Sequence, residues 1–262
     1  MNESELKIML QGLLNKDITV NQAVDRLKNT VLRNTELGYA NPDHHRELRH
    51  GLNEVIYGEN KTVEQIIKIA THLAEHNRCV LISRLNQEKI SVLTNSFKEA
   101  RVNEMAGTFM IHPPSITPVD VNKKFVAIVS AGTSDMRVSE EAFEVCVAMK
   151  IPAQRIYDVG VAGLHRIMAS LEMLQKASAV IVIAGMEGAL PSVVGGLIGS
   201  PIIAVPTSIG YGASFQGIAA LLGMLNSCAP GVVVTNIDAG FSAGFAAARI
   251  INRMNKDEDT LS

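Results

Sequence analysis

The sequence predicts an α/β protein in two parts, a small α+β domain followed by a doubly wound parallel sheet with three layers. Two observations lead to this fold class. From residue 125 to residue 254, short apolar strands alternate with helical segments, which is typical of parallel sheets covered by helices on both faces. Glycine is also unevenly distributed, because 5 of the 20 glycines precede residue 124 and 15 follow it.

A proline-rich segment marks the expected boundary between the two parts. Residues 112–118 read His-Pro-Pro-Ser-Ile-Thr-Pro, and three prolines cannot be accommodated inside a helix or a central strand. We therefore expect a first domain over residues 1–118 and a second domain over residues 119–262.

The first domain is expected to combine three helices with two strands. Two of the helices begin at capping boxes, in which a threonine, Thr19 or Thr62, is followed three residues later by a glutamine. The expected helices cover residues 4–14, 19–32 and 62–76, and the expected strands cover residues 79–83 and 108–111.

The second domain is expected to contain five strands, each followed by a helix. The strands are expected at residues 125–130, 156–159, 179–184, 201–205 and 232–237. Four of the helices are expected at residues 139–149, 165–177, 215–226 and 241–254, and the helix after the third strand is expected to have a Gly-rich start and to end at residue 197. Ligands of such sheets bind beyond the carboxyl ends of the strands. The five loops that follow the strands are therefore where a site is expected.

The loop after the first strand is small and polar. Its side chains and free N–H groups suit an anion at a helix N-terminus, although ordinary helix caps are the alternative. The residues concerned are Ser130, Gly132, Thr133, Ser134 and Asp135.

The loop after the second strand carries charge. It contains Asp158 and the pair His165 and Arg166. A lone histidine is more often structural, but beside an arginine at a strand-to-helix loop it favours contact with a phosphate or a carboxylate.

The other three loops add a further acid in an apolar setting and a set of hydrogen-bond donors. After the third strand come Gly185, Met186 and Glu187. The sequence leaves three roles open for Glu187: a charge that stabilises the start of a helix, a general base, or an acceptor for a sugar hydroxyl. The last two loops supply Thr207, Ser208 and Asp238. Five such loops at one edge predict a phosphate-bearing ligand.

The three cysteines, Cys79, Cys146 and Cys228, are too few for a disulfide framework and are expected to stay reduced in a cytoplasmic protein. Cys228 lies between a helix end and a strand start, at the opposite end of the sheet from the five loops. A helix C-terminus opposes a thiolate, so a buried structural thiol and a catalytic thiol both remain open.

Composition argues against two classes of partner. The net charge is −2 and the chain has no Trp, which does not favour nucleic acid or an anionic membrane. No uninterrupted apolar run reaches the ~20 residues of a membrane span. His72 and His76 have helical spacing for a metal, but no third ligand is evident and the metal ligands stay unknown.

These motifs resemble two related families. Residues 132–135, the pair at 165–166 and residues 184–190 are similar to the PurE-type aminoimidazole ribonucleotide carboxylases of purine synthesis. A closer resemblance is to the LarB-type pyridinium-3,5-biscarboxylic acid mononucleotide synthases of nickel-pincer cofactor synthesis. It rests on residues 43–46, 49, 51, 54–57, 130–135, 156–166, 184–196, 205–215 and 222–228. Departures from the LarB-type pattern are Asn53, Ala239 and Ser242, and the last two flank Asp238.

The LarB-type resemblance implies a PurE-like, flavodoxin-like second domain and a defined reaction. The family carboxylates the pyridinium ring of nicotinic acid adenine dinucleotide at C5, with CO2 or bicarbonate, and hydrolyses the phosphoanhydride to release AMP. The resemblance implies that Cys228 forms the covalent adduct that makes the ring nucleophilic. Glu187 or Asp135 is then the expected base.

The resemblance also implies binding roles. Residues 132–134 and 207–208 would hold phosphate, and Arg166 would pair with phosphate or carboxylate. Asp158 and Asp238 would position a divalent ion such as Mg2+ for the hydrolysis, and no organic cofactor is implied. The family's relatives form octamers, so Cys228 could act in the site of a neighbouring subunit.

The first domain has two expected roles, a lid that turns His44, Arg46 and Arg49 toward the ligand, or a platform for oligomerisation. Two alternatives to the LarB-type reaction stay open at this point. One is a PurE-type carboxylase or mutase of purine synthesis, which requires no nucleophilic cysteine. The other is a nucleotide-binding module without enzymatic activity.

Overall fold

A computed structural model of the 262-residue chain describes residues 3–30, 52, 54–74 and 79–261. It divides into two compact units: Met1–Arg101 with Phe109–Pro113, and Val102–Thr108 with Pro114–Ser262. The predictions made for residues 31–51, 53 and 75–78, which include His44, Arg46, Arg49 and His76, lie outside the described residues.

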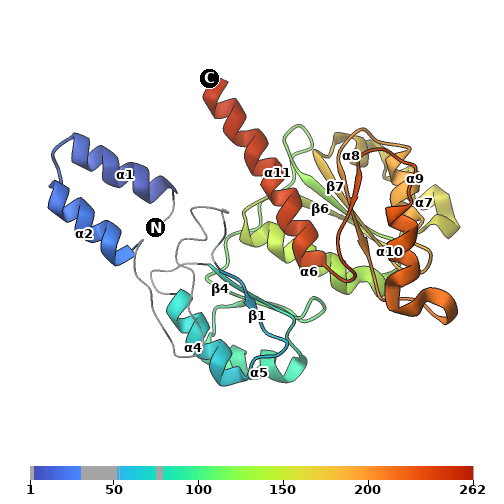
Figure 1. Cartoon of the computed structure of the whole chain (residues 1–262), viewed down its shortest axis with the longest axis horizontal. Coiled ribbons are helices and arrows are strands. Elements are labelled where there is room, and N and C mark those ends of the chain that lie inside the picture. Colours follow the sequence, from blue (N-terminus) through green and yellow to red (C-terminus); the bar gives the residue numbers. More distant parts are fainter. Residues whose placement is uncertain (1–2, 31–51, 53, 75–78, 262) are drawn as a thin grey trace. The chain divides into compact units, whose positions relative to one another are not determined.

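The first unit contains four described helices and most of a four-stranded mixed sheet (Figure 1), of which strand β3 falls largely in the second unit. The helices are α1 (Glu3–Leu14), α2 (Val20–Thr30), α4 (Val63–Leu73) and α5 (Gln87–Ser96). The strands are β1 (Ile56–Tyr57), β2 (Val80–Ser83), β3 (Arg101–Asn103) and β4 (Thr108–Ile111), in the order β1-β2-β4-β3. A mixed sheet with helices confirms the α+β class expected for this part.

Both predicted capping boxes are present. The Gln22 amide N–H donates to Thr19 Oγ1 at 3.2 Å, and the Thr19 N–H donates to Gln22 Oε1 at 2.8 Å. Thr62 and Gln65 make the same reciprocal pair at the start of α4. Strands β1 and β3 were not predicted because they have only 2 and 3 residues. Helix α5 was not predicted because it buries only Ile90 and Leu93, which gives a weak apolar pattern.

The second unit is built on a five-stranded, all-parallel sheet. Its strands are β5 (Val126–Ser130), β6 (Ala153–Ile156), β7 (Ala179–Ala184), β8 (Ile202–Pro206) and β9 (Val232–Val234), in the order β6-β5-β7-β8-β9. This is the flavodoxin-like order 2-1-3-4-5, so the predicted fold class is confirmed.

Helices cover both faces of this sheet (Figure 1). On one face lie α6 (Met136–Ala148) and α11 (Gly240–Leu261), which pack against each other and against the central strands. On the other face lie α7 (Leu164–Ala169), α8 (Leu171–Lys176), α9 (Leu190–Gly195) and α10 (Ile218–Leu225). The core on this second face takes alternate residues of the strands, for example Ala127 and Val129 of β5, as the two-residue period of a strand requires.

Several predicted boundaries were wrong. The second strand was expected at residues 156–159 but is β6, because its pairing with β5 begins at Ala153 and ends at Ile156. At the sheet edge it contains Gln154 and Arg155, so its residues lack the apolar run that marks a buried strand. Asp158 therefore follows the strand instead of lying within it.

The helices near the loops also differ from expectation. Helix α6 begins at Met136, three residues early, directly after the 3-10 turn η1 (Thr133–Asp135). The helix expected at 165–177 is broken into α7 and α8 at Ser170, and the helix expected from 215 begins at Ile218. Strand β9 ends at Val234, three residues short of the prediction.

Across the described residues, the helices are all too short or too polar to cross a bilayer.

The close packing of α6 against α11 depends on Gly244. A Cβ at this position would lie 2.6 Å from the Ala142 carbonyl oxygen and 3.0 Å from Val145 Cβ. Backbone atoms of a packed helix cannot yield, so Gly244→Ala is expected to destabilise the protein by about 1–3 kcal/mol, outweighing the higher helix propensity of alanine. Chemical denaturation measures this. Gly199→Ala is the control, because nothing lies within 4 Å of a Cβ there; equal stability of the two variants would contradict the prediction.

Candidate active site

Parallel pairing brings the predicted loops to one edge of the second sheet. The last residues of the five strands are Ser130, Ile156, Ala184, Pro206 and Val234. The loops after them contain the binding and acid residues that the sequence singled out.

Asp135 lies at the centre of these loops and is 3% exposed. Its Oδ1 accepts from Thr207 Oγ1 at 2.6 Å, and its Oδ2 accepts from the Gly132 amide at 2.9 Å. The Gly185 amide also donates to this carboxylate. One carboxylate therefore joins the loops after β5, β7 and β8.

Two opposing effects act on the pKa of Asp135. Burial raises it above the ordinary value and is the largest effect, and the nearby charge of Asp238 raises it further. The three hydrogen-bond donors lower it but do not cancel the burial. A buried acid with a raised pKa is suited to proton transfer nearer neutral pH.

Gly185 allows the loops after β7 and β8 to approach each other. A Cβ at Gly185 would lie 2.7 Å from Thr207 Oγ1 and still closer to the Ile209 carbonyl oxygen. The Met186 amide donates to that same carbonyl at 2.9 Å. Only glycine fits here, because the closest neighbour is backbone.

The loop after β6 is tied to β5 through Ser130. The buried Ser130 Oγ accepts from the Asp158 amide at 3.3 Å. Asp158 has a φ of 58°, and its Oδ2 lies 2.8 Å from Arg166 Nη1. These side chains are 52% and 36% exposed, so the ion pair contributes at most about 1 kcal/mol and Arg166 is available to a ligand anion.

The loops after β8 and β9 are joined through Asp238. Its Oδ1 accepts from the Ser208 amide at 2.9 Å, and its own amide donates to the Pro206 carbonyl at 2.8 Å. Asp238 adopts a φ of 55°, in the left-handed region that aspartate tolerates.

The predicted site residues differ in exposure, and Gly132, Arg166 and Asp238 are partly buried. Ser130, Asp135 and Thr207 are buried, and their hydrogen bonds hold the loops in place. Seven others are exposed at the same edge: Thr133, Ser134, Asp158, His165, Met186, Glu187 and Ser208. The Thr207 hydroxyl is committed to Asp135, so phosphate binding by this loop would depend on its other groups.

Asp158 and Asp238, which were assigned above to a divalent ion, are bonded to the ends of two inner strands. The Asp158 amide donates to Ser130 at the end of β5, and the Asp238 amide donates to Pro206 at the end of β8. In the portion of the chain that the structure describes, no three His, Cys, Asp or Glu side chains are grouped as a metal site.

The three cysteines, all within the described residues, have different environments. Cys146 is buried, and burial raises its pKa to about 12. Cys79 is partly buried, and Cys228 alone is exposed. Cys228 lies after α10 and before β9, at the amino edge of the sheet and opposite the loops.

Comparison with known proteins identifies the family. The model of the LarB/PurE-like N-terminal domain matches residues 34–113, and the AIR carboxylase model matches residues 125–260. An uncharacterized protein of Methanocaldococcus jannaschii is 36% identical over 258 residues, which cover 96% of this chain and 98% of that protein. The chain belongs to the LarB-type family.

Two further comparisons match about half of this LarB-type chain. A protein of Methanothermobacter thermautotrophicus named probable N5-carboxyaminoimidazole ribonucleotide mutase is 32% identical over 136 residues, covering 49% of this chain and 38% of that protein. The crystal structure of a Treponema denticola PurE2 variant aligns with 53% of this chain and 94% of its own at 19% identity, with a TM-score of 0.39.

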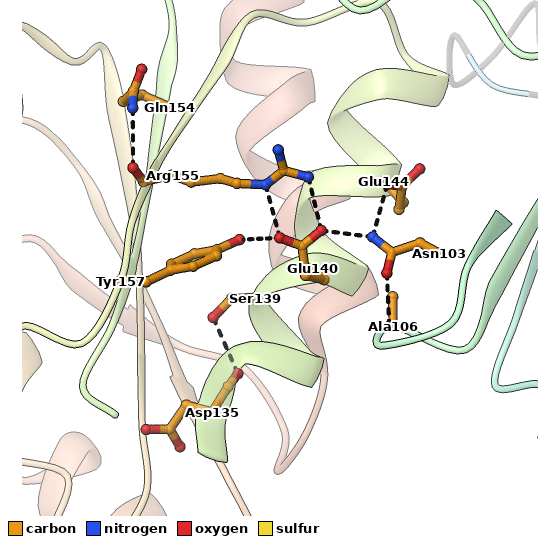
Figure 2. A network of polar contacts seen from close by, with 9 residues as sticks. All are labelled: Asn103, Ala106, Asp135, Ser139, Glu140, Glu144, Gln154, Arg155 and Tyr157. Carbon is orange, nitrogen blue, oxygen red and sulfur yellow. Dashed lines mark hydrogen bonds and ion pairs between the residues drawn. The ribbon is translucent and has the colours of Figure 1, made fainter. Parts of the chain in front are cut away.

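A polar network beside the candidate site was missed in the sequence. Glu140 of α6 binds Arg155, Tyr157 and Asn103 (Figure 2). The available signal was three glutamates, at 140, 141 and 144, in a helix that is otherwise largely apolar and buried. Acids in such a helix require partners, and none could be assigned from sequence distance alone.

The hydrogen bond from Thr207 predicts how Asp135 titrates. Thr207→Val removes a donor that favours the charged carboxylate, so the pKa of Asp135 should rise further above its ordinary value. Carbon NMR of the Asp135 carboxyl group against pH measures the midpoint. Thr235→Val is the control, because the Thr235 hydroxyl donates to the Ala204 and Asn236 carbonyls instead. An unchanged or lower midpoint in Thr207→Val would refute this account of the buried acid.

Proposed function

We propose that this LarB-type chain carboxylates the pyridinium ring of nicotinic acid adenine dinucleotide at C5 and hydrolyses its phosphoanhydride. The products are pyridinium-3,5-biscarboxylic acid mononucleotide and AMP. Family membership supports a carboxylase, and the exposure of Cys228 is the observation that carries the finer proposal. A ring carboxylase of this kind needs an accessible thiol, whereas a purine-type carboxylase does not.

The thiol is needed because a pyridinium ring is electron-poor and cannot attack CO2. Addition of the Cys228 thiolate at C4 forms a C–S bond and leaves an enamine that is nucleophilic at C5. C5 then bonds to CO2, and a base removes the C5 proton. The C4–S bond breaks, the thiolate leaves with its electron pair, and the ring becomes aromatic again. Water cleaves the phosphoanhydride separately.

The carboxyl edge of the sheet supplies the binding groups for this reaction. In the proposal, Thr133 and Ser134 and the side chain of Arg166 hold phosphate, while the Gly132 N–H stays bonded to Asp135. Asp135 or Glu187 takes the C5 proton; Asp135 has the raised pKa that suits a base, and Glu187 has the exposure. Mg2+ is proposed to bind the substrate's phosphates, with Asp158 and Asp238 as the candidate protein ligands that position it for the hydrolysis.

In the proposal, a homo-oligomer brings Cys228 of one chain to the loops of another chain. Helix α10 exposes Ile218, Leu222 and Leu225, which lie at i, i+4 and i+7 on one side of the helix. This apolar stripe ends three residues before Cys228 and suits a protein interface. We propose that a second copy covers it, so that Cys228 reaches the site of its neighbour.

The purine-type reaction is the second candidate, because of the similarity to the Methanothermobacter protein over the carboxylase domain. It predicts turnover of an aminoimidazole ribonucleotide that is independent of Cys228. A nucleotide-binding module without activity predicts binding and no product.

The reaction is tested directly by incubating the protein with nicotinic acid adenine dinucleotide, bicarbonate and Mg2+. Mass spectrometry should detect the dicarboxylated mononucleotide together with AMP. Cys228→Ala should lower the rate of ring carboxylation at least ~10³-fold, because the covalent step is lost. Cys79→Ala is the matched control and should retain activity. Absence of product from the wild type would reject the proposed reaction, and product from Cys228→Ala would reject the thiolate mechanism.

Catalysis across subunits is tested by mixing two inactive variants. Cys228→Ala retains the loops, and Asp135→Asn retains the thiol. If the thiol is supplied by a neighbour, random mixed oligomers should regain about a quarter of wild-type activity, because one site in four then holds both native groups. No recovery after subunit exchange, or a fully active monomer in sizing experiments, would show that each chain uses its own Cys228.

A further inference from the structure

Glu140 is a buried acid at the junction of three segments of the second unit (Figure 2). Its Oε1 accepts from Tyr157 Oη at 2.7 Å and lies 2.8 Å from Arg155 Nε. Its Oε2 accepts from Arg155 Nη2 at 2.8 Å and from Asn103 Nδ2 at 2.6 Å. Each carboxylate oxygen thus has two donors, and the arginine binds in the bidentate manner that fixes geometry.

The network holds the end of an edge strand. Arg155 and Tyr157 are two residues apart and turn to the same side of the chain, toward α6 (Figure 2). The Arg155 guanidinium also lies 3.4 Å from the centroid of the Phe143 ring of α6. Because β6 pairs with β5 only as far as Ile156, Glu140 fixes the chain where the ladder stops.

The next residue along the chain is Asp158, which belongs to the candidate site. Asp158 directly follows Tyr157. It has a left-handed backbone, its N–H donates a hydrogen bond to Ser130 Oγ, and its carboxylate pairs with Arg166. A shift of Tyr157 would therefore move the Asp158–Arg166 pair directly.

Asn103, the last residue of β3, completes the network from the segment Val102–Thr108, which groups with the second unit although it precedes the proline-rich linker. Its side-chain amide donates to Glu140 at 2.6 Å and to Glu144 at 3.0 Å. Its Oδ1 accepts from the Ala106 amide at 3.1 Å, which sets the direction of the two N–H groups. Glu140 and Glu144 are both buried and lie one helical turn apart, so ionised side chains there repel unless donors lie between them.

We propose that Asn103, through Glu140, is a positioning residue that fixes the loop bearing Asp158 and Arg166. The kinetic part of this inference rests on the proposed function, in which Arg166 binds the substrate's phosphate. The structural part does not, because it concerns only how firmly the loop is held.

The structural part is tested by hydrogen–deuterium exchange of the full chain. In Asn103→Ala, the Asp158 and Val159 amides, which donate to Ser130, should exchange at least about fivefold faster, while the amides of Ala179–Ala184 in β7 stay unchanged. Asn122→Ala is the control, because Asn122 is an exposed asparagine bonded to Asp120. Unchanged exchange at residues 158–159 would overturn the proposal. If Asn103→Ala does not fold, Tyr157→Phe removes only the hydroxyl contact with Glu140 and should loosen the same two amides.

The kinetic part uses the carboxylation assay. Asn103→Ala should raise KM for the dinucleotide about five- to tenfold with less than about a twofold change in kcat, because Arg166 is displaced while Cys228 and Asp135 are retained. Glu144→Gln in the same variant removes one repelling charge and can donate to Glu140, so it should restore KM at least partly. In an Arg166→Ala background, Asn103→Ala should change KM no further.

The outcomes separate the two proposals. A wild type without product rejects the proposed reaction and leaves the exchange experiment to decide the role of Asn103. A wild type with product, together with additive effects of Asn103→Ala and Arg166→Ala on KM, overturns positioning through Arg166. A loss of stability with unchanged exchange at residues 158–159 means that Asn103 is structural only, which also overturns the proposal.

Discussion

The hydrogen bond between Thr207 and Asp135 is the contact on which the geometry of the site depends. A buried carboxylate is costly unless donors surround it, and here the donors come from the loops after three different strands. The three loops are thereby held together, because each supplies a hydrogen-bond donor to the same Asp135 carboxylate. The exposed groups at the same edge can then be held in fixed positions although they lie on loops.

Much of the fold could be predicted because its signals are local. Capping boxes at Thr19 and Thr62 start helices by bonds within four residues, and the fully buried strands β5 and β7 are continuous apolar runs. Strand β6 was misplaced by three residues because it lies at an edge, where pairing with β5 and the contact of Arg155 with Glu140 decide its limits. Such contacts join residues 15 or more positions apart and leave no periodic signal.

The site could be predicted only in part, for a related reason. Topology alone places Asp135, Asp158 and Asp238 at the carboxyl edge, because every strand of a parallel sheet ends there. The order of the strands was not available from the chain, and it is this order that decides which of the loops are neighbours. The burial of Thr207 was equally hidden, since a threonine after a strand can face either the solvent or a neighbouring loop.

The position of Cys228 is the observation that makes the proposed reaction depend on a second chain. The carboxyl edge of the sheet offers anion-binding groups and a buried acid, and these would serve a purine-type carboxylase as well as a pyridinium carboxylase. The difference in chemistry is a thiol, and the sheet places the exposed thiol at its amino edge. Within one chain, a strand of three to six residues separates the two edges by about 10–20 Å, too far for a covalent bond to a ring bound at the loops. In the proposed reaction, the same fold therefore changes its chemistry through assembly: the surface that buries the stripe of α10 also determines which ring the site can activate.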